Sequence, residues 1–132
     1  MKTKLTTQPQ AIRYFIEKMD IEMIDAFLDD DKTYHNLSKS LFLSKLQIGF
    51  EKFKSFGDTQ LISDKGNCES CDKTKTGFVF IGNNSKNYMS LLFTTADDRI
   101  IDLYECINFK NKNSNLNLKW RVFIVKELIL PL

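Results

Sequence analysis

Residues 77–109, GFVFIGNNSKNYMSLLFTTADDRIIDLYECINF, decide the fold that we expect for this chain. Three apolar runs, at 77–82, 88–95 and 100–109, are separated by the polar turn sequences NNSK and DD. Short apolar runs that alternate with turn residues are typical of consecutive antiparallel strands. The stretch therefore predicts a β-meander, whose last two strands join in a tight hairpin at 97–98.

A further apolar run follows the meander. Residues 118–130 include Trp120, Val122 and Ile124, and the proline at 131 would stop a strand from extending. We predict that this run adds the last strand. The antiparallel sheet would then cover residues 58–130 and begin only after Gly57.

Helices are expected before the sheet. Apolar residues recur at helical spacing at Ile12, Phe15, Ile16 and Met19, after a capping Thr7. This pattern predicts a first helix with one apolar face.

Two more helices follow in the expected order. Asp20 caps a short one, which the carboxylates at 29–31 should end because the C-terminus of a helix dipole is negative. Its apolar face consists of Ile24, Phe27 and Leu28. A third helix is expected at about 38–56, where Gly57 suits the C-terminal cap.

Helices followed by an antiparallel meander define an α+β architecture. The 132 residues are enough for a single domain, 1–132, with a helical part at 8–57 and a sheet at 58–130. We expect apolar residues of both parts to form the core: Ile12, Phe15, Ile16, Phe27, Leu46, Phe50, Phe53, Phe80, Leu91, Leu103 and Val122.

Residues 11–34, AIRYFIEKMDIEMIDAFLDDDKTY, resemble the opening of the nuclear transport factor 2-like superfamily. In that superfamily a first helix gives way to a short one, followed by an acidic turn and an aromatic residue, and the later elements have a similar order. The resemblance implies a cone-like α+β fold, with helices packed on a curved antiparallel sheet around an apolar pocket. The superfamily includes isomerases, dehydratases, transport adaptors and domains of unknown role, so the fold alone assigns no function.

The composition excludes several classes of function. The chain has one histidine, no glycine-rich phosphate loop and no hydrolase or metalloprotease motif, so acid–base and nucleophilic chemistry have few candidate residues. A net charge of +2 without a basic stripe argues against nucleic-acid binding. No apolar run reaches the roughly 18 residues that span a membrane. Three cysteines, an odd number, favour a reducing compartment, so we expect a cytoplasmic protein.

Asp102 and Tyr104 are the candidate chemical groups of the sheet. In a regular strand they share a face with Cys106, opposite Ile101 and Leu103. If that face lines the pocket of a cone, burial would raise the pKa of Asp102, which could act as an acid or base beside an orienting Tyr104 hydroxyl. If the face is the solvated side of the sheet, neither residue has a catalytic role.

Cys68 and Cys71 form a C-x-x-C pair, the one short motif with a specific chemistry. A zinc site needs about four such ligands, and only Cys106 and His35 are left to complete it. The pair lies in a loop between expected strands rather than in a βαβ unit, which argues against a thioredoxin-like redox role. We expect two reduced thiols in a surface loop.

The sequence leaves three functions open. We favour a non-catalytic module that binds a small apolar ligand or a protein partner, including a second copy of the chain, without a cofactor. Its apolar pocket would be formed by Phe50, Phe53, Asp102 and Tyr104. The first alternative is a small lyase or isomerase that uses Asp102 and Tyr104. The second is a zinc-stabilised domain that uses Cys68 and Cys71.

Overall fold

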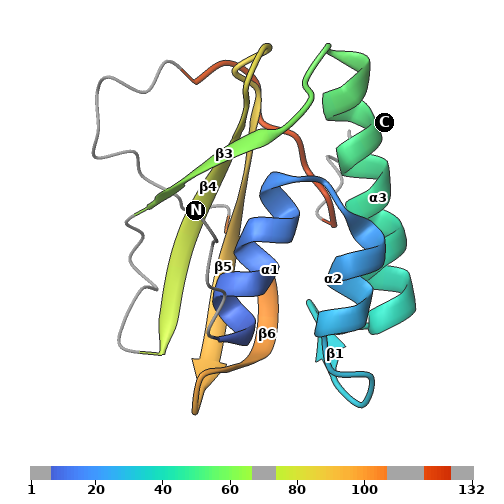
Figure 1. Cartoon of the computed structure of the whole chain (residues 1–132), viewed down its shortest axis with the longest axis vertical. Helices are drawn as coiled ribbons and strands as arrows, with labels where there is room; N and C mark the ends of the chain where they lie inside the picture. Colours follow the sequence, from blue (N-terminus) through green and yellow to red (C-terminus); the bar gives the residue numbers. More distant parts are fainter. Residues whose placement is uncertain (1–6, 67–73, 107–117, 126–132) are drawn as a thin grey trace, which may run out of the picture.

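Four antiparallel strands form the main sheet in the computed structural model, which describes residues 7–66, 74–106 and 118–125 (Figure 1). The strands are β3 (Leu61–Lys65), β4 (Lys75–Gly82), β5 (Tyr88–Ala96) and β6 (Arg99–Glu105), in that spatial order. Each strand pairs with the next one in the sequence. The predicted meander is therefore confirmed, and the end of its expected third run, at 107–109, lies outside the described residues.

The hairpin between β5 and β6 turns at Asp97 and Asp98, as predicted. Both residues have positive φ angles, 51° and 60°. Two consecutive residues with positive φ make the type I′ turn, whose twist matches the twist of paired strands.

A β-bulge next to this hairpin changes the faces of β6. The register shifts after Thr94, where β6 carries one additional residue, Ile101. As a result Ile100 and Leu103 are both fully buried, whereas Ile101 is 43% exposed. The prediction that Ile101 and Leu103 share a face is wrong, because period-two alternation fails across a bulge.

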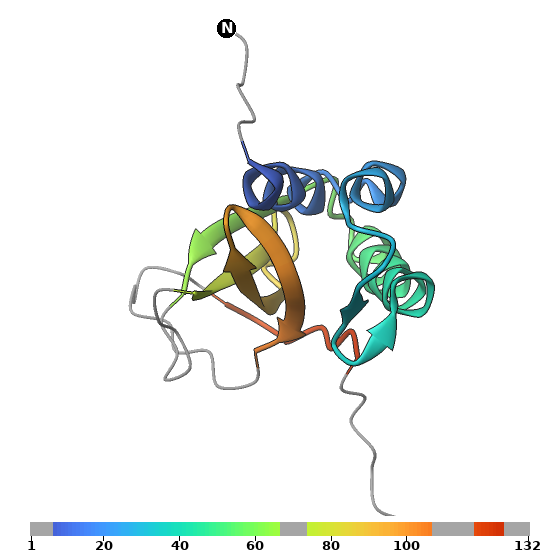
Figure 2. The same cartoon turned by 90° about the horizontal axis from the view of Figure 1, so that it is seen from below.

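Three helices precede the sheet: α1 (Gln8–Glu17), α2 (Ile21–Phe27) and α3 (Lys39–Ser55). The side chains of Thr7, Asp20 and Ser38 cap the three N-termini, and each accepts a backbone N–H from the first turn of its helix. All three helices lie on the same side of the curved sheet (Figure 2). Within the described residues, no helix has the length and apolarity needed to cross a membrane. The α+β fold with helices on a curved antiparallel sheet is thus confirmed.

A small hairpin that the sequence did not predict joins α2 to α3. Its strands are β1 (Thr33–Tyr34) and β2 (Leu37–Ser38). His35 and Asn36 form its turn, with φ angles of 56° and 60°. The main sheet begins after Gly57 as predicted, but this separate pair of strands precedes it.

Residues 118–125 do not form the predicted last antiparallel strand. Val122 donates its N–H to the carbonyl of Tyr88, and Tyr88 donates to the carbonyl of Trp120, so the segment makes an isolated parallel bridge to β5. The pairing of β6 with β5 ends at Leu91, and the segment lies beside Tyr88, the first residue of β5. It passes between the sheet and α3 (Figure 1). Residues 126–130 of the expected strand lie outside the described residues.

One cluster of buried apolar side chains fills the space between the helices and the sheet. Its largest members are aromatic and have almost no exposed surface: Tyr34, Phe42, Phe50, Phe53, Phe80 and Phe93. The predicted core is confirmed with one exception, Phe27, which is 41% exposed. Phe27 is the last residue of α2, and its ring packs on the outer side of Phe15, with centroids 5.2 Å apart.

Candidate functional site

Asp102 and Tyr104 contact the turn of the β1–β2 hairpin. Oδ1 of Asp102 accepts the backbone N–H groups of His35, at 2.9 Å, and Leu103, at 2.8 Å. The ring of Tyr104 stacks on the His35 imidazole with centroids 3.9 Å apart, and its hydroxyl accepts a hydrogen bond from Asn36 at 2.6 Å. The structure thus brings together three of the predicted site residues, and their contacts hold the hairpin turn against β6.

Phe50 and Phe53 belong to the hydrophobic core, where both side chains are fully buried. The clefts described below are lined by other residues, and neither Asp102 nor Tyr104 contributes to them. The assignment of these four residues to one ligand pocket, and of Asp102 and Tyr104 to catalysis, stays a prediction.

The candidate zinc ligands are only partly described. Cys68 and Cys71 lie outside the described residues, and Cys106 is a buried free cysteine. In the parts of the chain that are described, no group of three or more His, Cys, Asp and Glu side chains is arranged to hold a metal ion. Zinc binding through the C-x-x-C pair stays a prediction.

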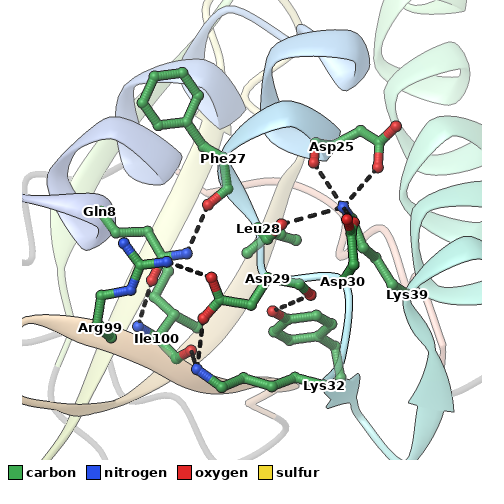
Figure 3. A network of polar contacts seen from close by, with 11 residues as sticks. Gln8, Asp25, Phe27, Leu28, Asp29, Asp30, Lys32, Lys39, Arg99 and Ile100 are labelled. Carbon is green, nitrogen blue, oxygen red and sulfur yellow. Dashed lines mark hydrogen bonds and ion pairs between the residues drawn. The ribbon is translucent and has the colours of Figure 1, made fainter.

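Two carboxylates of the acidic turn after α2, those of Asp29 and Asp30, pair with cations (Figure 3). The Asp29 carboxylate pairs with Lys32, at 2.5 Å, and with Arg99 of β6. The hydrogen bond from Lys32, with a further contribution from Arg99, outweighs burial and holds the pKa of Asp29 below its usual 3.8. This turn therefore ties the end of α2 to the sheet.

Lys39, the first residue of α3, binds the neighbouring helix end. Its ammonium group donates to the carbonyls of Asp25, at 2.7 Å, and Leu28, at 3.1 Å, and pairs with the carboxylates of Asp25 and Asp30 (Figure 3). Burial alone would lower the pKa of Lys39, but the hydrogen bonds to Asp30 and Asp25 raise it above 10.5. A cation at the C-terminus of α2 also offsets the helix dipole. These contacts, with those of Asp29, give the acidic turn a structural role.

The main candidate site is a cleft of about 520 Å³ where three distant parts of the chain meet. They are the end of α3, the turn before β5 and the segment 118–125. The lining residues are Lys52, Phe56, Asn87, Trp120, Arg121, Val122 and Phe123. Small-molecule sites have volumes of roughly 300–1,000 Å³, so the cleft has room for a compact organic molecule.

Aromatic side chains give the cleft much of its lining. Phe56 is 45% exposed, and Trp120, the one tryptophan of the chain, is 79% exposed. Phe123 is half-buried beside them. Large aromatic rings left this accessible around a concave surface are typical of a ligand or partner site.

Asn87 is the buried polar residue of the cleft, with only 6% of its surface exposed. Its side-chain oxygen Oδ1 accepts the backbone N–H of Trp120 at 3.1 Å. This bond fixes the orientation of the amide and leaves the nitrogen Nδ2, which has no acceptor among the described residues. Because Asn87 lines the cleft and its Nδ2 has no acceptor in the described residues, Nδ2 is available to a bound molecule as a hydrogen-bond donor.

The wall formed by residues 118–125 is firmly attached. The buried carboxylate of Glu105 accepts the backbone N–H groups of Ile124, at 2.6 Å, and Val125, at 3.0 Å. On the other side, Ile124 approaches α3 at Gly49, where an added Cβ would lie 3.5 Å from the Ile124 side chain. The cleft is therefore a preformed feature of the fold.

A second cleft of about 600 Å³ lies between α2 and α3. Its apolar lining includes Ile21, Leu43 and the exposed Ile48, and its acidic residues are Glu22 and Asp25. None of its polar side chains is buried. Because nothing buried would orient a ligand there, this cleft is the weaker candidate.

The cleft was not predicted from the sequence. Trp120 and Val122 fall in the predicted last strand, and position 56 ends the predicted third helix, which gives no reason to place these residues together. Asn87 lies at the end of a polar turn, where an asparagine is common. The available signal was a tryptophan in a run with Lys119 and Arg121, which is unusual for an interior strand.

One solved structure similar to this chain is the crystal structure of a protein described as "NTF2-like protein of unknown function", from Cytophaga hutchinsonii ATCC 33406. The two chains are 12% identical, with a TM-score of 0.49, and the alignment covers 83% of this chain and 95% of the other. No protein-family model and no curated protein matches the chain.

Proposed function

We propose that this protein binds a small organic molecule in the cleft between the end of α3 and residues 118–123, without catalysing a reaction. The observation that carries the proposal is Asn87, a buried amide whose oxygen is used by Trp120 and whose Nδ2 is left for a ligand. The exposed aromatic rings of Phe56 and Trp120 supply apolar contact on either side.

The residue types of the lining support binding rather than chemistry. Among the described residues that line the cleft, none has a carboxylate, imidazole, thiol or hydroxyl side chain. General acid–base and nucleophilic catalysis rely mainly on these groups. The described lining therefore offers contact area and hydrogen-bond donors, which are the requirements of a binding module.

The proposal is tested by NMR titration of the labelled protein with a set of small aromatic compounds. We expect backbone amide shifts to cluster at Phe56, Asn87 and residues 118–123. Phe56→Ser should weaken the binding, whereas Ile62→Ser is the matched control, because Ile62 is 52% exposed on β3 and lines no part of the cleft. Shifts that cluster elsewhere, or that persist unchanged in Phe56→Ser, would refute the proposal.

A further inference from the structure

Building on the proposed function, we infer that the molecule bound in this cleft is an organic anion, with an apolar body and one oxyanion head group. Among the described lining residues, the polar side-chain groups other than Oδ1 of Asn87 are all hydrogen-bond donors. They are the ammonium of Lys52, Nδ2 of Asn87, the indole N–H of Trp120 and the guanidinium of Arg121. The one acceptor among these side chains, Oδ1 of Asn87, is occupied by the backbone N–H of Trp120.

The backbone carbonyls at the end of α3, beside the cleft, are also occupied. The last carbonyls of α3 would attract a cation if they were open. The carbonyl of Lys52 accepts from Phe56 and Ser55, that of Phe53 from Phe56 and Asp58, and that of Lys54 from Gly57. Asn84 donates its side-chain amide to the carbonyl of Phe56. At the α3 end of the cleft, a ligand therefore meets hydrogen-bond donors rather than open acceptors.

The charged side chains of the segments that form the cleft are all positive. The three segments that form it, residues 52–57, 83–88 and 118–123, carry five cations and no carboxylate. The cations are Lys52, Lys54, Lys86, Lys119 and Arg121. A concave surface lined with one sign of charge concentrates ligands of the opposite sign.

The acids that border these segments do not cancel the field where a ligand would sit. Asp58 is buried, and its carboxylate accepts hydrogen bonds from the backbone N–H groups of Asn84 and Ser85 and from the Ser85 hydroxyl. Glu105 is buried and accepts the backbone N–H groups of residues 124 and 125. Glu51, which precedes Lys52 on α3, is exposed and does not line the cleft.

Not every cation has the same role. The guanidinium of Arg121 lies over the rings of Tyr88 and Phe123, 5.3 and 5.7 Å from their centroids, and donates to the Ser90 hydroxyl. Lys52 is an exposed lysine that lies one helical turn before Phe56 on the same side of α3. Lys52 and Asn87 are therefore the expected partners of the oxyanion, and Phe56 and Trp120 those of the apolar body.

The test compares phenylbutyrate with phenylbutyramide, its uncharged counterpart of the same shape. Trp120 is the one tryptophan of the chain, so its fluorescence reports on the cleft. We expect the carboxylate to bind at least about fivefold more tightly than the amide at low salt, with an advantage that shrinks as salt screens the charges. Inorganic phosphate alone should leave the fluorescence unchanged at the concentration that saturates phenylbutyrate, because it lacks the apolar body.

Lys52→Gln should weaken phenylbutyrate binding about threefold and leave the amide unaffected. Lys65→Gln, the control, removes the same charge from an exposed position on β3 that pairs with Phe78 in the middle of β4 and lines no described part of the cleft, and it should change neither affinity. Equal binding of carboxylate and amide, lost in Phe56→Ser, would overturn the anionic ligand class but keep the proposed function. If neither compound binds, both the ligand class and the proposed function fail.

Discussion

The carboxylate of Asp58 fills the space that a Cβ on Gly82 would need. Oδ2 of Asp58 lies too close to that position for both atoms to be accommodated, and the same carboxylate accepts the backbone N–H groups of Asn84 and Ser85. A glycine at position 82 lets an acidic side chain from the loop after α3 reach inside the β4–β5 turn. This contact also fixes the start of the turn that carries Asn87.

Two glycine substitutions should therefore have opposite effects. Gly82→Ala places a Cβ on Asp58 and should lower the free energy of unfolding by about 2–3 kcal/mol. Gly49→Ala, in the middle of α3, meets its nearest atom in Ile124 at 3.5 Å, an ordinary contact. It should raise the free energy of unfolding by about 0.5–1 kcal/mol, the usual gain from replacing a helical glycine. Urea denaturation measures both, and a Gly82→Ala protein as stable as the wild type would contradict the geometry.

Asp102 offers a test of its structural role. Because Oδ1 accepts two backbone N–H groups, Asp102→Ala should lower the free energy of unfolding by about 1–2 kcal/mol. Asp102→Asn keeps an oxygen in the same place and should recover most of that loss. The comparison is made by urea denaturation at neutral pH. If the asparagine variant is as unstable as the alanine variant, the negative charge rather than the acceptor is what the hairpin requires.

Glu105→Gln should loosen residues 118–125. The carboxylate accepts from Ile124 and Val125 with separate oxygens, and a glutamine replaces one of these oxygens with an NH₂ group that opposes a donor. We expect a loss of about 1–3 kcal/mol in the free energy of unfolding and faster hydrogen exchange at the amides of residues 124 and 125. Glu51→Gln on the exposed side of α3 is the control and should change neither quantity.

The acidic turn predicts the dependence of stability on pH at acid values. The pKa of Asp29 is lower in the folded protein than its usual 3.8, so its ionised form favours folding. That contribution is complete above pH 3.8 and is lost as the pH falls through the lowered pKa of the folded state. Urea midpoints measured across this range should fall less steeply in Asp29→Asn than in the wild type, and parallel curves would argue against the ion pairs.

Lys39 acts at the other end of the pH scale. Its pKa is above 10.5 in the folded protein, so its contribution is complete below pH 10.5 and is lost as the pH rises through the raised value. Burial also raises the pKa of Tyr34 above 10.0, which gives the same sign. Lys39→Met should therefore reduce, without abolishing, the loss of stability at alkaline pH. If the urea midpoints of Lys39→Met fall at alkaline pH as steeply as those of the wild type, Lys39 does not contribute to this loss of stability.

The elements that the sequence predicted correctly depend on local rules. The helix caps at Thr7 and Asp20 and the turn at Asp97 and Asp98 are set by residues close in the chain. The elements that were not predicted from the sequence depend on residues that are distant in the chain. The bulge at Ile101 follows from the pairing of β6 with β5, which no short pattern in β6 reveals.

The candidate site was harder to predict for the same reason. Phe50 and Phe53 have the spacing of a pocket wall, but the same spacing serves a core, and the structure uses it for the core. Asn87 becomes a site residue only when Trp120 approaches and occupies its oxygen. That approach requires a parallel segment beside β5, whereas the apolar run at 118–130 indicated an antiparallel strand.

The parallel attachment of residues 118–125 also determines when the cleft exists during folding. The sheet from β3 to β6 joins strands that are neighbours in the chain, and such short-range contacts form early. The cleft requires residues 52–57 to meet residues 118–123, which follow every strand of the sheet. A partly folded chain can therefore hold its helices and sheet and still be unable to bind. A ligand would in turn stabilise the docked segment by mass action, so binding would report that folding is complete.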